Sequence, residues 1–130
     1  MRSMNRSITK VLVVEDDFLA QMVAKLLLEQ LACEVDVAKS EEEALEKTSI
    51  YEYHLIFMDI GLGTSNGFSV TNKIKENSKN LNTPVVALTA HHTVEYQQQA
   101  EAVGMVAFIT KPLEMNTVND LLSKYTAINQ

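Results

Sequence analysis

Five short apolar segments recur along this chain, and they constrain its fold more than any other feature of the sequence. Each segment has the length of a β-strand, and the first, third and fourth are almost continuously apolar instead of alternating with polar residues. Such continuous runs are typical of strands in a parallel sheet that helices cover on both faces. The five segments are residues 11–14, 35–38, 54–58, 84–89 and 105–109.

The segment after the first predicted strand has the spacing of an amphipathic helix. Apolar residues recur about every four positions, with Gln21, Lys25 and Glu29 between them. This pattern predicts a long, well-packed helix whose apolar stripe faces the core and whose polar residues face solvent. The predicted stripe consists of Phe18, Leu19, Met22, Val23, Leu26, Leu27 and Leu31.

Other segments between the predicted strands give weaker helical signals. Ser40 followed by Glu43 fits a capping box and predicts a short helix that begins just after Ser40. Further helices are expected at about residues 68–75 and 115–125. Residues 93–102 are polar and poorly patterned, so a helix there gains little from burial and is expected to be marginal.

Strands that alternate with helices predict right-handed crossovers between parallel strands. The expected fold class is α/β, a doubly wound sandwich with a five-stranded parallel sheet and helices on both faces. In sheets of this kind, ligands bind beyond the carboxyl ends of the strands. The residues that follow each strand are therefore the candidates for function.

Composition limits the class of protein and its partners. The 130 residues suit one domain, and the net charge of −6 gives little electrostatic support for direct nucleic acid binding. Cys33 is the only cysteine, which excludes an intramolecular disulfide and suits a reducing compartment. Neither a signal peptide nor a membrane-spanning apolar run is visible. We therefore expect a cytoplasmic segment without membrane contact.

Five residues with reactive or charged side chains follow the predicted strands: Glu15, Asp16, Asp59, Thr89 and Lys111. Three carboxylates brought together would repel one another unless a cation joined them, and Mg²⁺ prefers such oxygen ligands. A lysine and a hydroxyl beside them would suit a tetrahedral anion attached to a carboxylate. The sequence therefore predicts a magnesium site that also accepts a phosphoryl group on an aspartate.

Each of these residues also has a simpler interpretation by itself. Asp59 alone would be read as a turn residue or helix cap, Lys111 as its salt-bridge partner, and Thr89 as a residue bonded to the backbone. Phe108 would be read as a core residue, and Asp17 as a residue that favours the start of the first helix. Only the combination of several strand-end positions favours the chemical interpretation.

Four strings resemble the signature segments of response-regulator receiver domains, in order and at similar spacing: VLVVEDD, LIFMDIGLGTSNGF, VVALTA and FITKPL. The resemblance covers essentially the whole chain. It implies a flavodoxin-like sheet with strand order 2-1-3-4-5 in a receiver domain at residues 9–126. Residues 1–8 would form a flexible N-terminal tail and residues 127–130 a C-terminal tail.

The resemblance also implies roles for the residues at the metal site. Glu15 and Asp16 match the acidic pair that holds Mg²⁺, for which Mn²⁺ could substitute. Asp59 matches the phosphoryl acceptor and a metal ligand, and the backbone carbonyl of Gly61 completes the metal site. The loop departs from the family at Gly63, where a proline is common, so we expect a looser loop there.

Further roles concern phosphoryl binding and switching. Thr89 matches the switch hydroxyl, and Ala90 follows it in the phosphoryl-binding segment. Phe108 matches the switch aromatic residue, and Lys111 the lysine that contacts the phosphoryl group. Pro112 implies a cis Lys111-Pro112 bond.

The function implied is a switch in two-component, or phosphorelay, signal transduction. The chain would take a phosphoryl group from a phosphohistidine on a histidine kinase or phosphotransfer domain. It would not be an enzyme beyond catalysing its own phosphorylation and slow dephosphorylation. Its output would be protein contact through the fourth helix, fifth strand and fifth helix. A stand-alone regulator and a module of a hybrid histidine kinase both stay open, and the ALTA and KPL strings resemble the latter somewhat more.

Three other classes of protein compete with this hypothesis. A nucleotide- or flavin-binding protein on the same architecture lacks support, because neither G-x-G-x-x-G nor a P-loop follows the first strand. A phosphatase with a nucleophilic aspartate would need a second aspartate at the position of Gly61. An inert interaction module is disfavoured because all five key positions are filled.

Overall fold

The computed structural model describes residues 8–77 and 79–126. The two tails expected at residues 1–8 and 127–130 therefore lie outside the described residues, apart from residue 8. None of the helices in the described ranges has the length and apolar character needed to cross a membrane.

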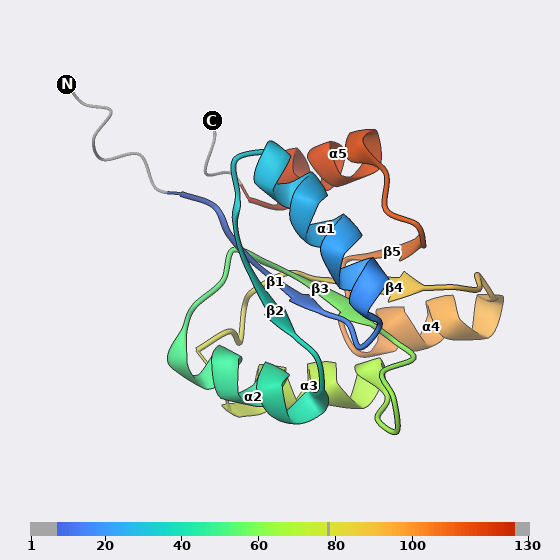
Figure 1. The fold of residues 1–130 in the computed structure, drawn as a ribbon. Helices are drawn as coiled ribbons and strands as arrows, with labels where there is room; N and C mark the ends of the chain where they lie inside the picture. The colour runs from blue at the N-terminus through green and yellow to red at the C-terminus, as the bar shows by residue number, and fades with distance from the viewer. Residues whose placement is uncertain (1–7, 78, 127–130) are drawn as a thin grey trace.

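A parallel sheet forms the centre of the described part of the chain, and its five strands have the order β2-β1-β3-β4-β5. The predicted fold class and strand order are thus confirmed (Figure 1). Each predicted strand forms, with its bounds shifted by two residues or fewer. The strands are β1 Lys10–Val14, β2 Glu34–Ala38, β3 Leu55–Asp59, β4 Val85–Thr89 and β5 Ala107–Thr110.

Helices cover both faces of this sheet (Figure 1). Helices α1 and α5 lie on one face, and α2, α3 and α4 lie on the other. Side chains of successive strand residues point to opposite faces, so β1, β3 and β4 contribute to two cores and are apolar except at Lys10, Asp59 and Thr89 at their ends. The helices are α1 Phe18–Gln30, α2 Glu41–Ile50, α3 Gly67–Asn77, α4 Val94–Ala102 and α5 Met115–Tyr125.

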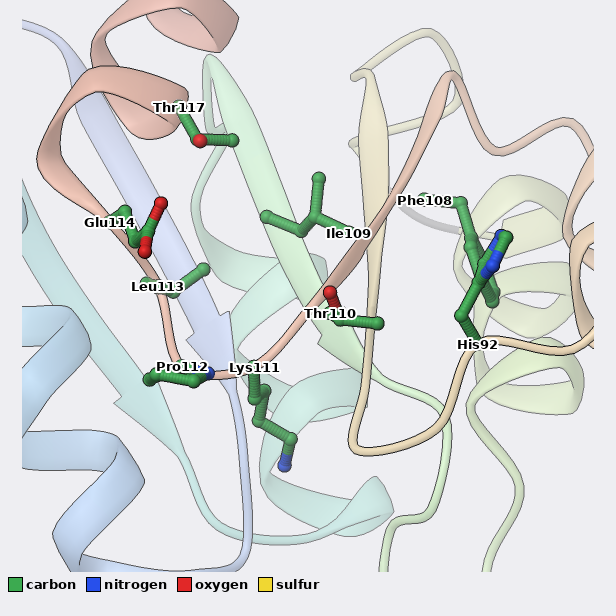
Figure 2. Close-up of a pocket in the computed structure, with 9 residues that line it drawn as sticks. All are labelled: His92, Phe108, Ile109, Thr110, Lys111, Pro112, Leu113, Glu114 and Thr117. Carbon is green, nitrogen blue, oxygen red and sulfur yellow. The ribbon is translucent and has the colours of Figure 1, made fainter.

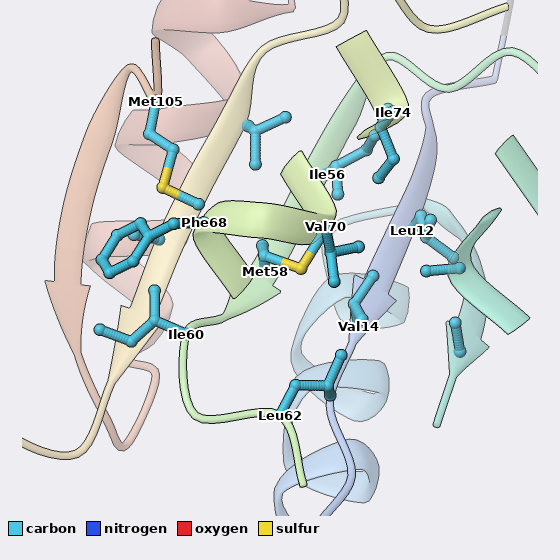
Figure 3. Close-up of a cluster of buried hydrophobic side chains, with 14 of the residues drawn as sticks. Leu12, Val14, Ile56, Met58, Ile60, Leu62, Phe68, Val70, Ile74 and Met105 are labelled. Atoms are coloured by element: carbon cyan, nitrogen blue, oxygen red, sulfur yellow. The ribbon is translucent and has the colours of Figure 1, made fainter. Parts of the chain in front are cut away.

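The core beneath α2, α3 and α4 shows this alternation clearly (Figure 3). Alternate residues of the central strands meet apolar residues of the helices and of the loop after β3, and most of these side chains are fully buried. The labelled members are Leu12, Val14, Ile56, Met58, Ile60, Leu62, Phe68, Val70, Ile74 and Met105. This packing fixes where β1 and β3 end, and thus where the candidate site begins.

Side-chain caps define where several helices begin. The Ser40 hydroxyl accepts the Glu43 N–H at 3.2 Å, and the Glu43 carboxylate accepts the Lys39 N–H at 2.8 Å. The marginal fourth helix does form. Thr93 caps it by accepting the Tyr96 N–H at 3.1 Å, and Ala100 is its buried residue.

The predicted inward face of α1 is wrong for most of its residues, although Leu31 packs against the core as predicted. Phe18, Leu19 and Leu26 are 72%, 68% and 57% exposed, and Met22 and Val23 are exposed as well, whereas Gln21, Ala24 and Leu28 are buried. The apolar residues of α1 span more than one face, so their spacing does not decide which face packs. Small Ala24 lets the helix lie close to the sheet, and the Gln21 amide finds a partner there, the carbonyl oxygen of Glu15.

Candidate functional site

The candidate residues meet at the edge of the sheet where the strands end. Glu15 and Asp16 follow β1, Asp59 ends β3, Thr89 ends β4 and Lys111 follows β5. All five line one cavity of about 290 Å³. Oxygen atoms of the three carboxylates lie within 4.8 Å of one another. The parallel sheet thus brings together residues that are as far as 96 positions apart in the chain.

The cluster carries more negative than positive charge, and much of it is buried. Glu15 and Asp59 are 1% and 4% exposed, whereas Asp16 is exposed. The Lys111 ammonium lies 2.9 Å from Glu15 Oε1 and 3.4 Å from Asp59 Oδ2. One ammonium therefore contacts two of the three clustered carboxylates.

The titration of these groups reflects burial and mutual charge. Burial raises the pKa of Glu15 to about 7, although the Lys111 ammonium opposes the rise; the nearby Asp59 carboxyl group adds to it. Burial by itself would lower the pKa of Lys111, but hydrogen bonding to Glu15 and the charge of Asp59 outweigh this effect and raise it. The raised pKa values of Glu15 and Lys111 thus both reflect an excess of negative charge at a site with little solvent.

This arrangement fits a hard divalent cation. Clustered carboxylate oxygens with one exposed member resemble the donor sets that bind Mg²⁺ together with water. The Gly61 N–H donates to Asp59 Oδ1 at 3.0 Å and orients that carboxylate. The role of the Gly61 carbonyl as a ligand stays a prediction.

Two glycines, Gly63 in the loop after β3 and Gly67 at the start of α3, make close approaches to the acidic residues. Gly63 has a φ of +58°, and a Cβ there would lie 3.5 Å from Asp16 Oδ2. Proline cannot adopt this φ, which gives a physical reason for glycine at this departure from the family pattern. A Cβ on Gly67 would lie 2.5 Å from the Asp59 carbonyl oxygen. Sequence analysis missed Gly67, because its only signal was a turn-like Asn66-Gly67 pair.

The same loop is tied to α2 and to the core. Ser65 donates its hydroxyl to Glu41 Oε1 at 2.8 Å, and Lys73 pairs with the other oxygen of Glu41. The side chain of Leu62 is buried in the core. The loop that was expected to be loose is therefore anchored to α2 through Ser65 and to the core through Leu62.

The switch residues are divided between two cavities. The Thr89 hydroxyl donates to the His91 carbonyl oxygen at 2.7 Å and accepts the His91 N–H at 3.0 Å, so it bonds to backbone as its simpler interpretation held. Ala90 lines the acidic cavity. Phe108 does not: its ring lies against His92, with centroids 5.2 Å apart, beside a separate cavity (Figure 2).

Pro112 also lies outside the acidic cavity, at the turn after β5 (Figure 2). Its peptide bond with Lys111 is cis, the form that the resemblance implied. Asp17 caps α1 by accepting the Ala20 N–H at 2.9 Å, which confirms its assigned role. Two further residues that sequence analysis did not single out, Asn66 and Tyr96, line the acidic cavity.

An apolar groove of about 330 Å³ adjoins the acidic cavity. Residues of α1, including Leu19 and Val23, form one wall, and Pro112 with its neighbour forms the other. Glu15 and Lys111 line both the groove and the acidic cavity. The exposed apolar face of α1 is thus continuous with the candidate site.

Comparison with known proteins gives a consistent picture. The family model described as "Response regulator receiver domain" matches residues 11–123. The chain is 34% identical over 122 residues to hybrid signal transduction histidine kinase L of Dictyostelium discoideum, covering 89% of this chain and 7% of that protein. It is 34% identical over 116 residues to the aerobic respiration control sensor protein ArcB of Escherichia coli, covering 88% and 15%. The chain thus spans a small part of the length of these relatives.

Solved structures show the same fold. Chemotaxis protein CheY4 of Vibrio cholerae superposes with a TM-score of 0.83 at 28% identity, covering 92% of this chain and 99% of that one. The receiver domain of sensor histidine kinase PA1611 of Pseudomonas aeruginosa superposes with a TM-score of 0.84 at 24% identity, covering 95% and 100%. That structure has a magnesium ion coordinated in its active site cleft.

Proposed function

This chain belongs to the response regulator receiver domain family of two-component signalling, and we propose that it accepts a phosphoryl group on Asp59 in a Mg²⁺-dependent reaction. One observation carries the proposal. The Asp59 carboxylate lies at the carboxyl end of the central strand, close to the Lys111 ammonium and to two further carboxylates. Transfer of a phosphoryl group depends mainly on positioning and charge neutralisation, and these residues are arranged for both.

In the proposed reaction, a carboxylate oxygen of Asp59 attacks the phosphorus atom of a phosphohistidine. The new O–P bond forms as the P–N bond breaks, and the imidazole leaves with that electron pair and takes up a proton. Glu15, Asp16, Asp59 and the Gly61 carbonyl would hold Mg²⁺. When bound, this ion would supply positive charge to neutralise the phosphoryl oxygens. Lys111 would turn from Glu15 toward the phosphoryl group, its nearest approach to Asp59 already being 3.4 Å. The chain would act only on itself, including slow hydrolysis of the product.

The added charge would then bias the loop after β4. The Thr89 hydroxyl would exchange its bond with the His91 carbonyl for one with the phosphoryl group. Movement of this loop would release the Phe108 ring from its contact with His92. The surface formed by α4, β5 and α5 would change as a result and meet a downstream protein. Cytoplasmic location stays a prediction that suits such partners.

The phosphohistidine partner would dock on the apolar face of α1. Exposed apolar patches of this kind often mark protein contacts, and this one adjoins the acidic cavity through the groove that Glu15 and Lys111 share with it. A partner that delivers phosphoryl to Asp59 has to cover this neighbourhood. Leu19→Ser should slow transfer from a phosphohistidine protein and leave modification by acetyl phosphate unchanged. Equal slowing of both would contradict this docking surface.

Treatment with acetyl phosphate tests the proposal directly. Mass spectrometry should find one added phosphoryl group on Asp59 in the presence of Mg²⁺ and none after chelation. Asp59→Asn should abolish the modification, whereas Asp120→Asn on the exposed side of α5 should not. Incorporation into Asp59→Asn at the wild-type rate would refute the assignment.

A further inference from the structure

We propose that Gln21 is a positioning residue for the metal site, because its side chain fixes the peptide group that joins Glu15 to Asp16. The inference rests on the proposed function and deepens it. Gln21 is the fourth residue of α1 and is 9% exposed, although apolar neighbours on the same helix face solvent. Its amide Nε2 donates to the Glu15 carbonyl oxygen at 2.8 Å.

In the orientation of α1 that allows this hydrogen bond, several large apolar side chains stay exposed to water, which costs free energy of folding. A rotation of the helix that buried Phe18, Leu19 or Leu26 would remove more apolar surface from water than Gln21 does. A buried primary amide is tolerated when its hydrogen bonds are made. The chain thus places a donor, instead of a large apolar side chain, beneath the first acidic residue of the site.

The carbonyl that Gln21 holds belongs to the peptide whose N–H is that of Asp16. The side chain and N–H of Glu15 have other restraints: Lys111 and the Asp17 N–H hold its carboxylate, and its own N–H donates to the Ala38 carbonyl at 3.0 Å. In the part of the chain that the structure describes, the Glu15 carbonyl oxygen accepts its hydrogen bond from the Gln21 amide. Rotation of that peptide would therefore be limited mainly by Gln21.

Asp16 depends on this restraint more than the other two acids do. Its carboxylate is exposed, whereas those of Glu15 and Asp59 are buried and hydrogen-bonded. The backbone of Asp16 thus largely determines where its carboxylate points. Some residues form hydrogen bonds to metal ligands and orient them without touching the metal. Removing such a residue commonly lowers the affinity for the metal by about 10- to 100-fold. Loss of the Gln21 donor should weaken Mg²⁺ binding although Gln21 touches no metal.

Gln21→Met tests the inference, since methionine has a similar length and no donor. Calorimetric titration of the full chain with MgCl₂ should give a Kd about tenfold higher than that of the wild type. Ala24→Gly is the matched control, because it lies one turn along the same buried face and weakens the helix without touching the Glu15 peptide. It should lower the midpoint of thermal unfolding and leave the Kd for Mg²⁺ within twofold of the wild-type value.

A Gln21→Met protein that binds Mg²⁺ within twofold of the wild type would overturn the inference. If that variant does not fold, the wild type decides: the Gln21 side-chain amide resonance should shift during the titration along the same curve as the Asp16 backbone amide. A Gln21 resonance that does not move overturns the inference as well. Absence of Mg²⁺ binding by the wild type would instead refute the proposed function.

Discussion

Gly67→Ala should destabilise the protein, although alanine normally favours a helix over glycine. A Cβ at this position, the first of α3, would lie 2.5 Å from the Asp59 carbonyl oxygen and 2.7 Å from the Ile60 Cα. Ordinary contacts begin at 3.4 Å, so backbone would have to move by roughly 0.9 Å. The strand end resists this movement because Asp59 pairs with β4 and the Gly67 N–H donates to the Ile60 carbonyl at 3.1 Å.

The size of the effect follows from two opposing contributions. Overpacking against the backbone of Asp59 and Ile60 should cost about 3 kcal/mol, the upper part of the usual range. The helix preference for alanine offsets up to about 1 kcal/mol. The free energy of unfolding should therefore fall by about 2 kcal/mol, which lowers the urea midpoint by about 1 M. Displacement of Asp59 should also slow its modification by acetyl phosphate.

Gly61→Ala is the matched control on the other side of the same aspartate. A Cβ there would meet nothing closer than Asp59 Oδ1 at 3.9 Å. Its urea midpoint should equal or slightly exceed that of the wild type, because alanine lowers the entropy of the unfolded chain. A Gly67→Ala protein as stable as the wild type, or more stable, would refute the steric argument.

Four further predictions concern charge and buried hydrogen bonds. Burial raises the pKa of Glu15 from 4.5 to about 7, so between these pH values the metal-free folded state holds a proton that the unfolded state lacks. The free energy of unfolding of the metal-free protein, measured by urea titration, should therefore fall as the pH rises from 5 to 7.5. Since Mg²⁺ must displace that proton, the Kd for Mg²⁺ should rise about fivefold between pH 7 and pH 6, and a constant Kd would contradict this. Lys111→Met should tighten Mg²⁺ binding about tenfold by removing a competing cation, as calorimetry would show, while slowing phosphorylation. Asn80→Ala should lower the free energy of unfolding by about 3 kcal/mol, because the fully buried amide bonds two backbone carbonyls and one N–H; exposed Asn82→Ala should change it by less than about 0.5 kcal/mol.

Much of the fold was predictable because strand and helix patterns are local. β3 was expected at residues 54–58 and lies at Leu55–Asp59, and α5 has the predicted bounds of 115–125. The position of the site was predictable for a related reason. In a parallel sheet the carboxyl ends of β1, β3 and β4 lie at one edge, so the residues after them had to converge.

The sequence was less informative about which side chains meet. It predicted the wrong face of α1, because several faces of that helix are apolar and only the fit against the sheet chooses among them. It left open whether the Thr89 hydroxyl bonds to backbone, as it does at His91, and it gave no sign that Phe108 lies outside the acidic cavity. These outcomes depend on loops and rotamers, whose energies differ too little to leave a periodic pattern.

The sequence alone therefore determined the order of strands and helices, the doubly wound architecture and the set of acidic, hydroxyl and amine groups at the strand ends. Only the tertiary structure decided that Lys111 contacts Glu15 at 2.9 Å, that Gly67 leaves room for the Asp59 carbonyl, and that Gln21 supports the first acid. The physical reason is the distance along the chain over which the interactions act. The spacing of apolar residues reflects interactions between near neighbours in the sequence, whereas contacts between distant segments depend on differences of tenths of an ångström that no local pattern encodes.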